Sequence, residues 1–301
     1  HNVSPSSTAN YALPSQRTEL IRAIAPHFEH RLFLSATPHN GYQESFTALL
    51  ELLDDQRFAR GVMPGEKQRQ RTIVRRLKSD LPGFPERVLK PLEVSYDQDE
   101  LQAHSLLKQY VKLRSEQSGP KKFGSDFIHK LLKKRLFSSP RAFAATLSKH
   151  RETLKGHAQR NESAFQERIL RKAIQRADEE YADDQKADEA MEEALTVATE
   201  SSNAVTAEQE TILDQLAQWA NGARNRPDSK AQAILHWLDK HLKTTGEPND
   251  KRVILFTEYR DTHSWLFEIL TNHGWRGDLL MSLHGGTDPD EREKIKAAFQ
   301  A

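Results

Sequence analysis

The feature that most constrains this chain is a stretch over residues 97–225 whose pattern is helical nearly throughout. Few Gly or Pro residues interrupt it, and the clear breaks are Gly119-Pro120 and Ser139-Pro140. The apolar residues recur three and four positions apart and form a narrow stripe, which favours a helical hairpin or coiled coil over a thick core. We therefore expect an all-α region that separates the two ends of the chain.

The flanking regions, residues 1–96 and 226–301, alternate short apolar runs with helical periodicity, which is typical of an α/β fold. Arg31–Ser35 and Val253–Thr257 have the composition of buried parallel strands, and Asp278–Ser282 supplies another strand. The sequence therefore predicts two α/β parts with a helical insertion between them.

Helix ends are also marked in the C-terminal region. Gly274 is expected to end a helix, because glycine adopts the left-handed conformation needed there without strain. Asp288 is placed to cap the next helix, and Pro289 suits its first position because proline needs no backbone N–H partner there.

Charge is balanced overall but segregated along the chain. Lys and Arg (44) nearly cancel Asp and Glu (43), so the total charge does not class the whole chain as a nucleic-acid binder. Lys121–Arg160 is a basic arm interleaved with Phe residues, whereas Asp178–Glu193 is an acidic arm. The basic arm could contact nucleic acid. It could equally be a solvated face whose Phe residues belong to the core, or it could pair with the acidic arm.

Several function classes are excluded by composition. The chain has no Cys, so it has no disulfide, thiolate metal site or Cys nucleophile, and its His residues show no metal-ligand spacing. No run approaches the roughly 20 apolar residues of a membrane-spanning helix, so we expect a cytoplasmic protein with no membrane contact. The chain begins at His1 without Met and ends at Ala301 without a helix stop signal, and we expect a piece cut from a longer protein.

The most specific motif is Leu34–Gly41, with the sequence LSATPHNG. Its hydroxyl side chains can bond to backbone, phosphate or a carboxylate, and such bonds can pass a small movement between two sites. Taken alone, Ser35 and Thr37 could equally cap a helix.

The complete string resembles the third motif of Swi/Snf-type helicase-like ATPases. Residues 31–60 are similar to RapA/HepA-like helicases and to the DrmD-like helicases of DISARM phage-defence systems. The resemblance continues, in the family's order, at Val74–Asp80, Asp228–Lys230, Phe256–Tyr259 and Leu283–Gly286, and it covers about half of the chain.

The resemblance implies partial RecA-like lobes, each a parallel sheet with helices: the end of the first lobe in residues 1–96 and the start of the second in 226–301. It implies a translocase that moves on double-stranded DNA using ATP and Mg²⁺, with RNA polymerase or phage-defence subunits as further partners. The chain has no P-loop, no DEAH acids and none of the family's arginine fingers. We therefore expect it to be inactive alone and to hold no cofactor.

The resemblance also assigns candidate residues. Catalytic or coupling roles fall on His1, which would end the DEAH box, and on Ser35, Ala36 and Thr37. Nucleic-acid binding falls on Arg75, Arg76, Lys78, Thr257, His284, Gly285 and Gly286.

These assignments have structural alternatives. Thr257 could simply end a strand, His284 could be a turn residue before two glycines, and the basic cluster at 75–78 could be a solvated helical face. For the whole chain, the alternative function is a non-catalytic helical scaffold that binds protein partners.

Overall fold

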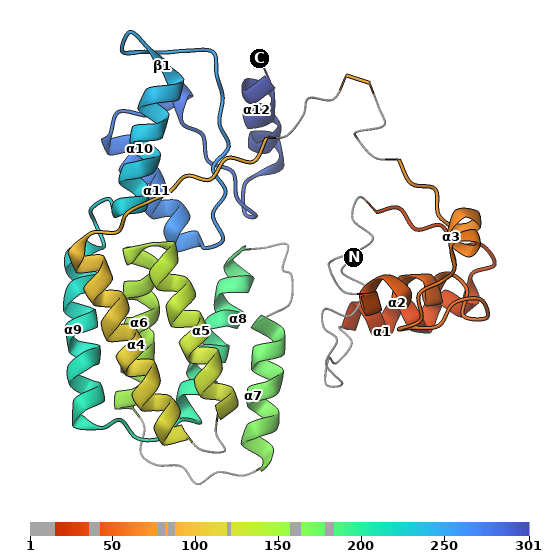
Figure 1. Cartoon of the computed structure of the whole chain (residues 1–301), viewed down its shortest axis with the longest axis horizontal. Coiled ribbons are helices and arrows are strands. Elements are labelled where there is room, and N and C mark those ends of the chain that lie inside the picture. Colours follow the sequence, from red (N-terminus) through yellow and green to blue (C-terminus); the bar gives the residue numbers. More distant parts are fainter. Residues whose placement is uncertain are drawn as a thin grey trace. The chain divides into compact units, whose positions relative to one another are not determined.

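A computed structural model describes residues 16–35, 43–76, 82–83, 88–118, 122–156, 164–177 and 184–300. The chain divides into two compact units, His1–Lys90 and Pro91–Ala301. Figure 1 shows that helices make up nearly all of the regular structure in each unit.

Unit 1 contains α1 (Gln16–Ile24), η1 (Ala25–His27), α2 (Gln43–Leu53) and α3 (Glu66–Thr72). Helix α2 is its most buried element, and Leu50 is 3% exposed. The guanidinium of Arg31 donates to the carbonyls of Leu52 and Leu53, at 3.0 and 3.2 Å, and so satisfies acceptors at the end of α2. The Thr47 hydroxyl accepts from the backbone N–H of Gly61 at 2.8 Å and fixes the following loop to the same helix.

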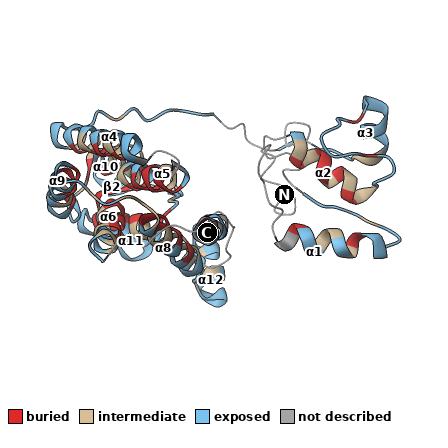
Figure 2. Cartoon of the chain, turned by 90° about the horizontal axis from the view of Figure 1, so that it is seen from below, coloured by how far each residue is buried: buried red, intermediate tan, exposed pale blue. Residues whose placement is uncertain are grey.

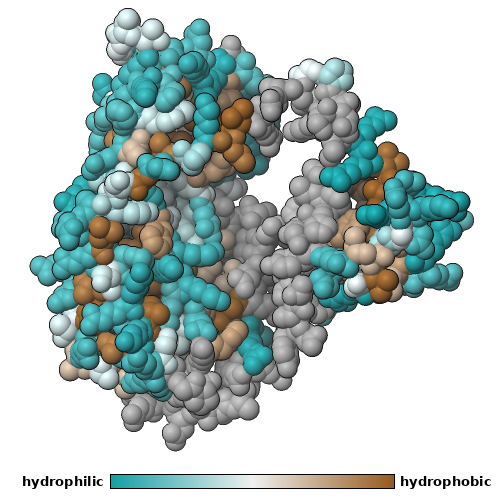
Figure 3. Space-filling model, viewed as in Figure 1, coloured by the Kyte–Doolittle hydropathy of each residue, from teal (hydrophilic) through white to brown (hydrophobic). Residues whose placement is uncertain are grey.

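Most of unit 2 is a helical bundle. Its helices are α4 (Gln98–Ser118), α5 (Lys122–Ser138), α6 (Pro140–Lys155), α7 (Ala164–Ala177), α8 (Asp184–Glu200) and α9 (Ala207–Ala223). Helix α6 packs against α5, α8 and α9, α4 packs against α5 and α9, and α7 packs along α8. Buried residues turn inward from these helices in Figure 2, and Phe143, Leu132 and Leu216 are fully buried. Figure 3 shows that hydrophilic residues cover most of the outer face on view.

The C-terminal part of unit 2 has its own small core. It contains α10 (Ser229–Leu242), β1 (Lys243–Thr244), β2 (Glu247–Pro248), α11 (Arg260–Asn272), η4 (Gly277–Leu279) and α12 (Pro289–Gln300). Leu235 and Leu238 of α10 pack against Trp265 and Ile269 of α11. Helix α12 buries none of its residues.

The prediction of RecA-like lobes with parallel sheets is wrong for the described residues. Their only sheet is the antiparallel pair of β1 and β2, each two residues long. The expected strands at 31–35 and 253–257 are without regular structure, and 278–282 begins within η4. A parallel strand needs a hydrogen-bonded neighbour and cover on both faces. Instead Leu34 is 87% exposed and Phe256 is 90% exposed.

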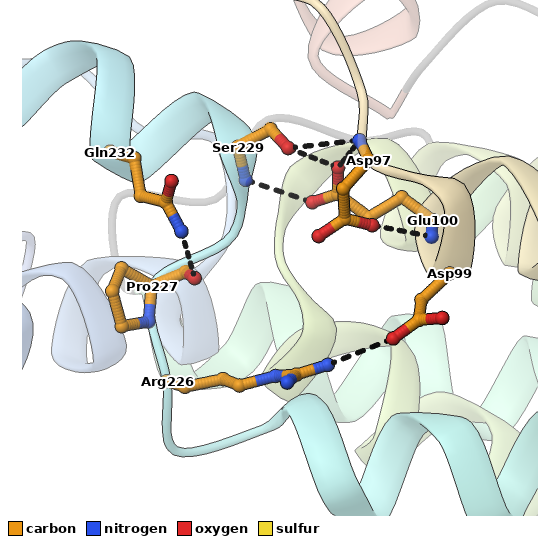
Figure 4. Close-up of polar contacts among 7 residues, drawn as sticks. All are labelled: Asp97, Asp99, Glu100, Arg226, Pro227, Ser229 and Gln232. Atoms are coloured by element: carbon orange, nitrogen blue, oxygen red, sulfur yellow. Dashed lines mark hydrogen bonds and ion pairs between the residues drawn. The ribbon is translucent and has the colours of Figure 1, made fainter.

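A polar clasp joins the two ends of the bundle (Figure 4). Asp97 directly precedes α4 and Glu100 lies in its first turn. Glu100 accepts from the backbone N–H of Ser229 at 2.8 Å and from its hydroxyl. The Ser229 hydroxyl also lies 3.2 Å from the backbone N–H of Asp97, and Arg226 pairs with Asp99 at 3.6 Å. The chain therefore enters and leaves the bundle at one place.

The bundle core also holds a chain of polar groups. His150 is fully buried, with Nε2 lying 2.8 Å from the Tyr110 hydroxyl and Nδ1 lying 2.8 Å from the Thr199 hydroxyl. A neutral imidazole has one donor and one acceptor nitrogen, and each hydroxyl can take either role. The neutral ring therefore satisfies both contacts and ties α4, α6 and α8 together.

Candidate nucleic-acid interface

The predicted site residues of the first motifs lie in unit 1 or outside the described residues. The residues outside them are His1, Ala36, Thr37 and Lys78. Ser35 is exposed and is the last described residue before position 43. Arg75 and Arg76 are exposed and follow the end of α3 at Thr72. The roles assigned to all of these residues stay predictions.

Polar groups of the turn at His284, Gly285 and Gly286 form hydrogen bonds within residues 284–287. The backbone N–H of His284 donates to the Thr287 hydroxyl at 2.9 Å, and that of Gly286 donates to Nδ1 of His284 at 3.2 Å. The ring of His284 meets that of His263 edge-on, with centroids 5.9 Å apart. Because Nδ1 already accepts a hydrogen bond, a ligand could use only Nε2 of this ring.

Thr257 lies in a different setting, because it lines a groove of about 730 Å³ in unit 2. The groove is bounded by the end of α5, the start of α10, the start of α11 and the segment 254–259. Lysines, hydroxyls and apolar side chains all reach it. The lining residues include Lys130, Lys133, Lys134, Phe137, Lys230 and Phe256.

Lys230 is engaged in holding the groove together. Its Nζ donates to the carbonyl of Ser138 at 3.0 Å and to that of Phe137, which are acceptors at the end of α5. Burial lowers the pKa of Lys230, because it disfavours the charged ammonium, while Asp228 and Glu100 oppose this shift. Lys230 thus connects α10 to α5 and is a poor candidate for binding a ligand.

The lysines of α5 remain available. Lys134 pairs with Glu258 at 3.3 Å, but both side chains are exposed, and such a pair contributes little free energy. Lys130 and Lys133 are exposed, and neither has a hydrogen bond or ion pair among the described residues. These two ammonium groups, called here the positive edge, line the same groove as Thr257.

Buried polar contacts fix the walls of the groove. The guanidinium of Arg135 stacks on the Tyr259 ring, 3.8 Å from its centroid, and lies 3.5 Å from Asp188. The hydroxyl of Ser139 lies 2.9 Å from that of Thr262 at the start of α11. Burial, followed by the neighbouring carboxylate of Glu258, raises the pKa of Tyr259 to about 12. The α5–α6 corner and α11 are therefore held in a defined position.

Comparison of the chain with protein-family models, curated proteins and solved structures found no match. The described residues contain no group of His, Cys, Asp or Glu side chains placed to hold a metal ion. None of the described helices has the length and apolar character needed to cross a membrane. The functional assignment therefore depends on the groove and on the motifs.

The sequence identified part of this groove. Thr257 was named, and the lysines belong to the basic arm, but nothing in the sequence placed them together. Of the four Phe residues in that arm, Phe143 is buried and Phe127 packs on the core, whereas Phe123 and Phe137 are 48% and 36% exposed. The contact between Arg135 and Asp188 is an ion pair between the basic and acidic arms.

Proposed function

We propose that this chain is part of an ATP-dependent double-stranded DNA translocase of the Swi/Snf class and binds the DNA backbone through the groove at Thr257. The observation that carries the proposal is that Thr257, a motif residue, lines the same groove as Lys130 and Lys133. Ammonium and hydroxyl groups are the usual protein partners of phosphate oxygens. The order of the motifs in the sequence supports the proposed family, and the groove contains the groups that would bind phosphate.

The chain is proposed to have no ATPase activity of its own. Phosphoryl transfer needs a phosphate cradle, a metal held by carboxylates and cations that stabilise the transition state. The sequence has no P-loop, and the described residues offer no acidic cluster suited to Mg²⁺. ATP and Mg²⁺ therefore belong to the proposed parent protein, and no hydrolytic step is assigned to residues of this chain.

The test is a titration of the 301-residue chain with a fluorescent 20-base-pair duplex at several salt concentrations. Each phosphate neutralised by a lysine releases counterions and contributes about −0.9 to the slope of log K against log salt. Lys133→Gln is expected to weaken binding and to make the slope shallower by about 1. Lys112→Gln is the matched control, since Lys112 is exposed on α4 and does not line the groove.

A salt-independent response, or equal effects of Lys133→Gln and Lys112→Gln, would exclude backbone binding in the groove. Such a result would favour the scaffold function, in which helices hold protein partners. One observation favours that second candidate: the segment 254–256 exposes adjacent apolar side chains, with Ile254 57% and Phe256 90% exposed. Exposed apolar patches commonly mark protein-binding surfaces.

A further inference from the structure

The groove also presents apolar side chains, which the outer surface of duplex DNA does not contact. Its lining includes the apolar side chains of Ile254, Leu255 and Phe256 together with Phe137 and Trp265. Phe256 is 90% exposed, so its ring is open to solvent within a concave surface. An aromatic ring in this position offers a flat apolar face to a ligand.

The lysines of the positive edge and these apolar side chains line the same groove. The groove volume of about 730 Å³ lies within the range of about 300–1,000 Å³ typical of small-ligand sites. In a B-form duplex the bases are stacked inside, so the outer surface can neutralise Lys130 and Lys133 but cannot cover Phe256. An unpaired nucleotide can do both, because it carries a phosphate and an exposed base with a π face.

We infer that the groove binds an unpaired nucleotide of a single strand, with the base stacked on Phe256 and the phosphates beside Lys130 and Lys133. This inference rests on the proposed function, since it names the form of DNA that the same groove takes. The strand contacts are independent of base sequence, because every base can stack on an aromatic ring. The parent protein would then track on duplex DNA while this site holds a base that has left the duplex.

The test compares three fluorescent 20-nucleotide ligands: single-stranded DNA, the matching duplex and a single strand of abasic sugar-phosphate. We expect the single strand to bind more tightly than either of the other two. Phe256→Ala is expected to weaken single-strand binding by about 5- to 150-fold, the range for loss of one base–aromatic stack, and to leave duplex binding unchanged.

Phe256→Ala is expected to fold, because an exposed ring contributes little to a core. Phe256→Trp, which keeps a stacking surface, should restore single-strand binding. Phe299→Ala is the matched control, since Phe299 is 39% exposed on α12 and lies outside the groove. Thermal unfolding of each variant checks that the fold is intact.

The outcomes separate this inference from the proposed function. The stacking site is excluded if the duplex or the abasic strand binds as tightly as the single strand and Phe256→Ala does not weaken single-strand binding. If Lys133→Gln still weakens binding in that case, binding of the DNA backbone stands. If no ligand shows salt-dependent binding, the proposed function fails together with the inference.

Discussion

At the scale of single residues, the buried histidines make stability depend on pH. Burial, with smaller effects of Arg114 and His129, lowers the pKa of His150 to about 3. Burial lowers the pKa of His129 to about 4, with Arg114 acting in the same direction. Both values lie below the 6.5 of an unfolded histidine, so the unfolded chain takes up protons first as pH falls. The stability contributed by the neutral rings is present above pH 6.5 and is lost as pH falls towards 4 and 3.

We therefore predict a loss of stability between pH 7.5 and 5.5, measured by urea unfolding of the intact chain. Each of the two histidines is expected to lower the unfolding free energy by about 1.4 kcal/mol over this interval, because only the unfolded state is protonated. His150→Gln should be less stable at pH 7.5, since it disturbs the contacts with Tyr110 and Thr199. Its loss of unfolding free energy between pH 7.5 and 5.5 should nevertheless be about 1.4 kcal/mol smaller than that of the unaltered chain.

The matched control is His236→Gln, since His236 is exposed on α10 and makes no hydrogen bond among the described residues. It should retain the full pH dependence. An undiminished pH dependence in His150→Gln would contradict the assignment of this effect to the buried ring.

At the scale of elements, signals confined to a few residues predicted the structure well. Ser139-Pro140 was expected to break the helical pattern, and Ser139 caps α6 with Pro140 at its start. Asp288 was expected to cap the last helix, and its carboxylate accepts from the backbone N–H of Asp290 and Glu291 at 2.9 and 3.3 Å. Gly274 follows the C-cap residue of α11, His273, and has a φ of 104°, as a helix stop requires. In each case the interacting atoms lie within four residues.

Features that need distant partners could not be predicted in this way. The apolar composition of 31–35 and 253–257 indicated strands, but a strand exists only when another segment completes its hydrogen-bond ladder. The groove has the same limitation, because Lys133, Lys230 and Phe256 lie 26 to 123 residues apart in the sequence and only the tertiary fold brings them together. The sequence therefore supplied the chemical groups of the site without its geometry.

We predict that Ser139→Ala destabilises the chain by about 1–2 kcal/mol in urea unfolding. Ser139 accepts from the backbone N–H of Ala142 at 3.1 Å, and loss of such a cap costs about this amount. Its hydroxyl also contacts Thr262 of α11, so the substitution acts on both elements. Ser148→Ala is the control on the same helix, because Ser148 is exposed, and its effect should stay within about 0.5 kcal/mol. Equal effects of the two substitutions would contradict the capping role.

At the scale of the whole molecule, each compact unit has a core of its own. In unit 1 the buried apolar side chains are few, and Leu50 of α2 is among them. In unit 2 the bundle core extends over α4 to α9 and includes the fully buried Leu216. The clasp at Asp97 and Ser229 closes this bundle at one end, so its stability need not depend on the segments that precede it.

We therefore predict that the two units lose their structure separately in hydrogen exchange of the intact chain. Leu216→Ala leaves a cavity in the bundle and should lower the opening free energy of α9 amides by about 2–5 kcal/mol, without changing those of α2. Leu50→Ala should have the reverse pattern, with faster exchange in α2 and unchanged exchange in α9. The pair serves as its own control, since both substitutions remove the same atoms from a buried site. If either substitution lowered the protection of α2 and α9 amides equally, the two units would unfold as one cooperative body. Ligand binding in the groove of unit 2 would then be expected to protect α2 amides as well.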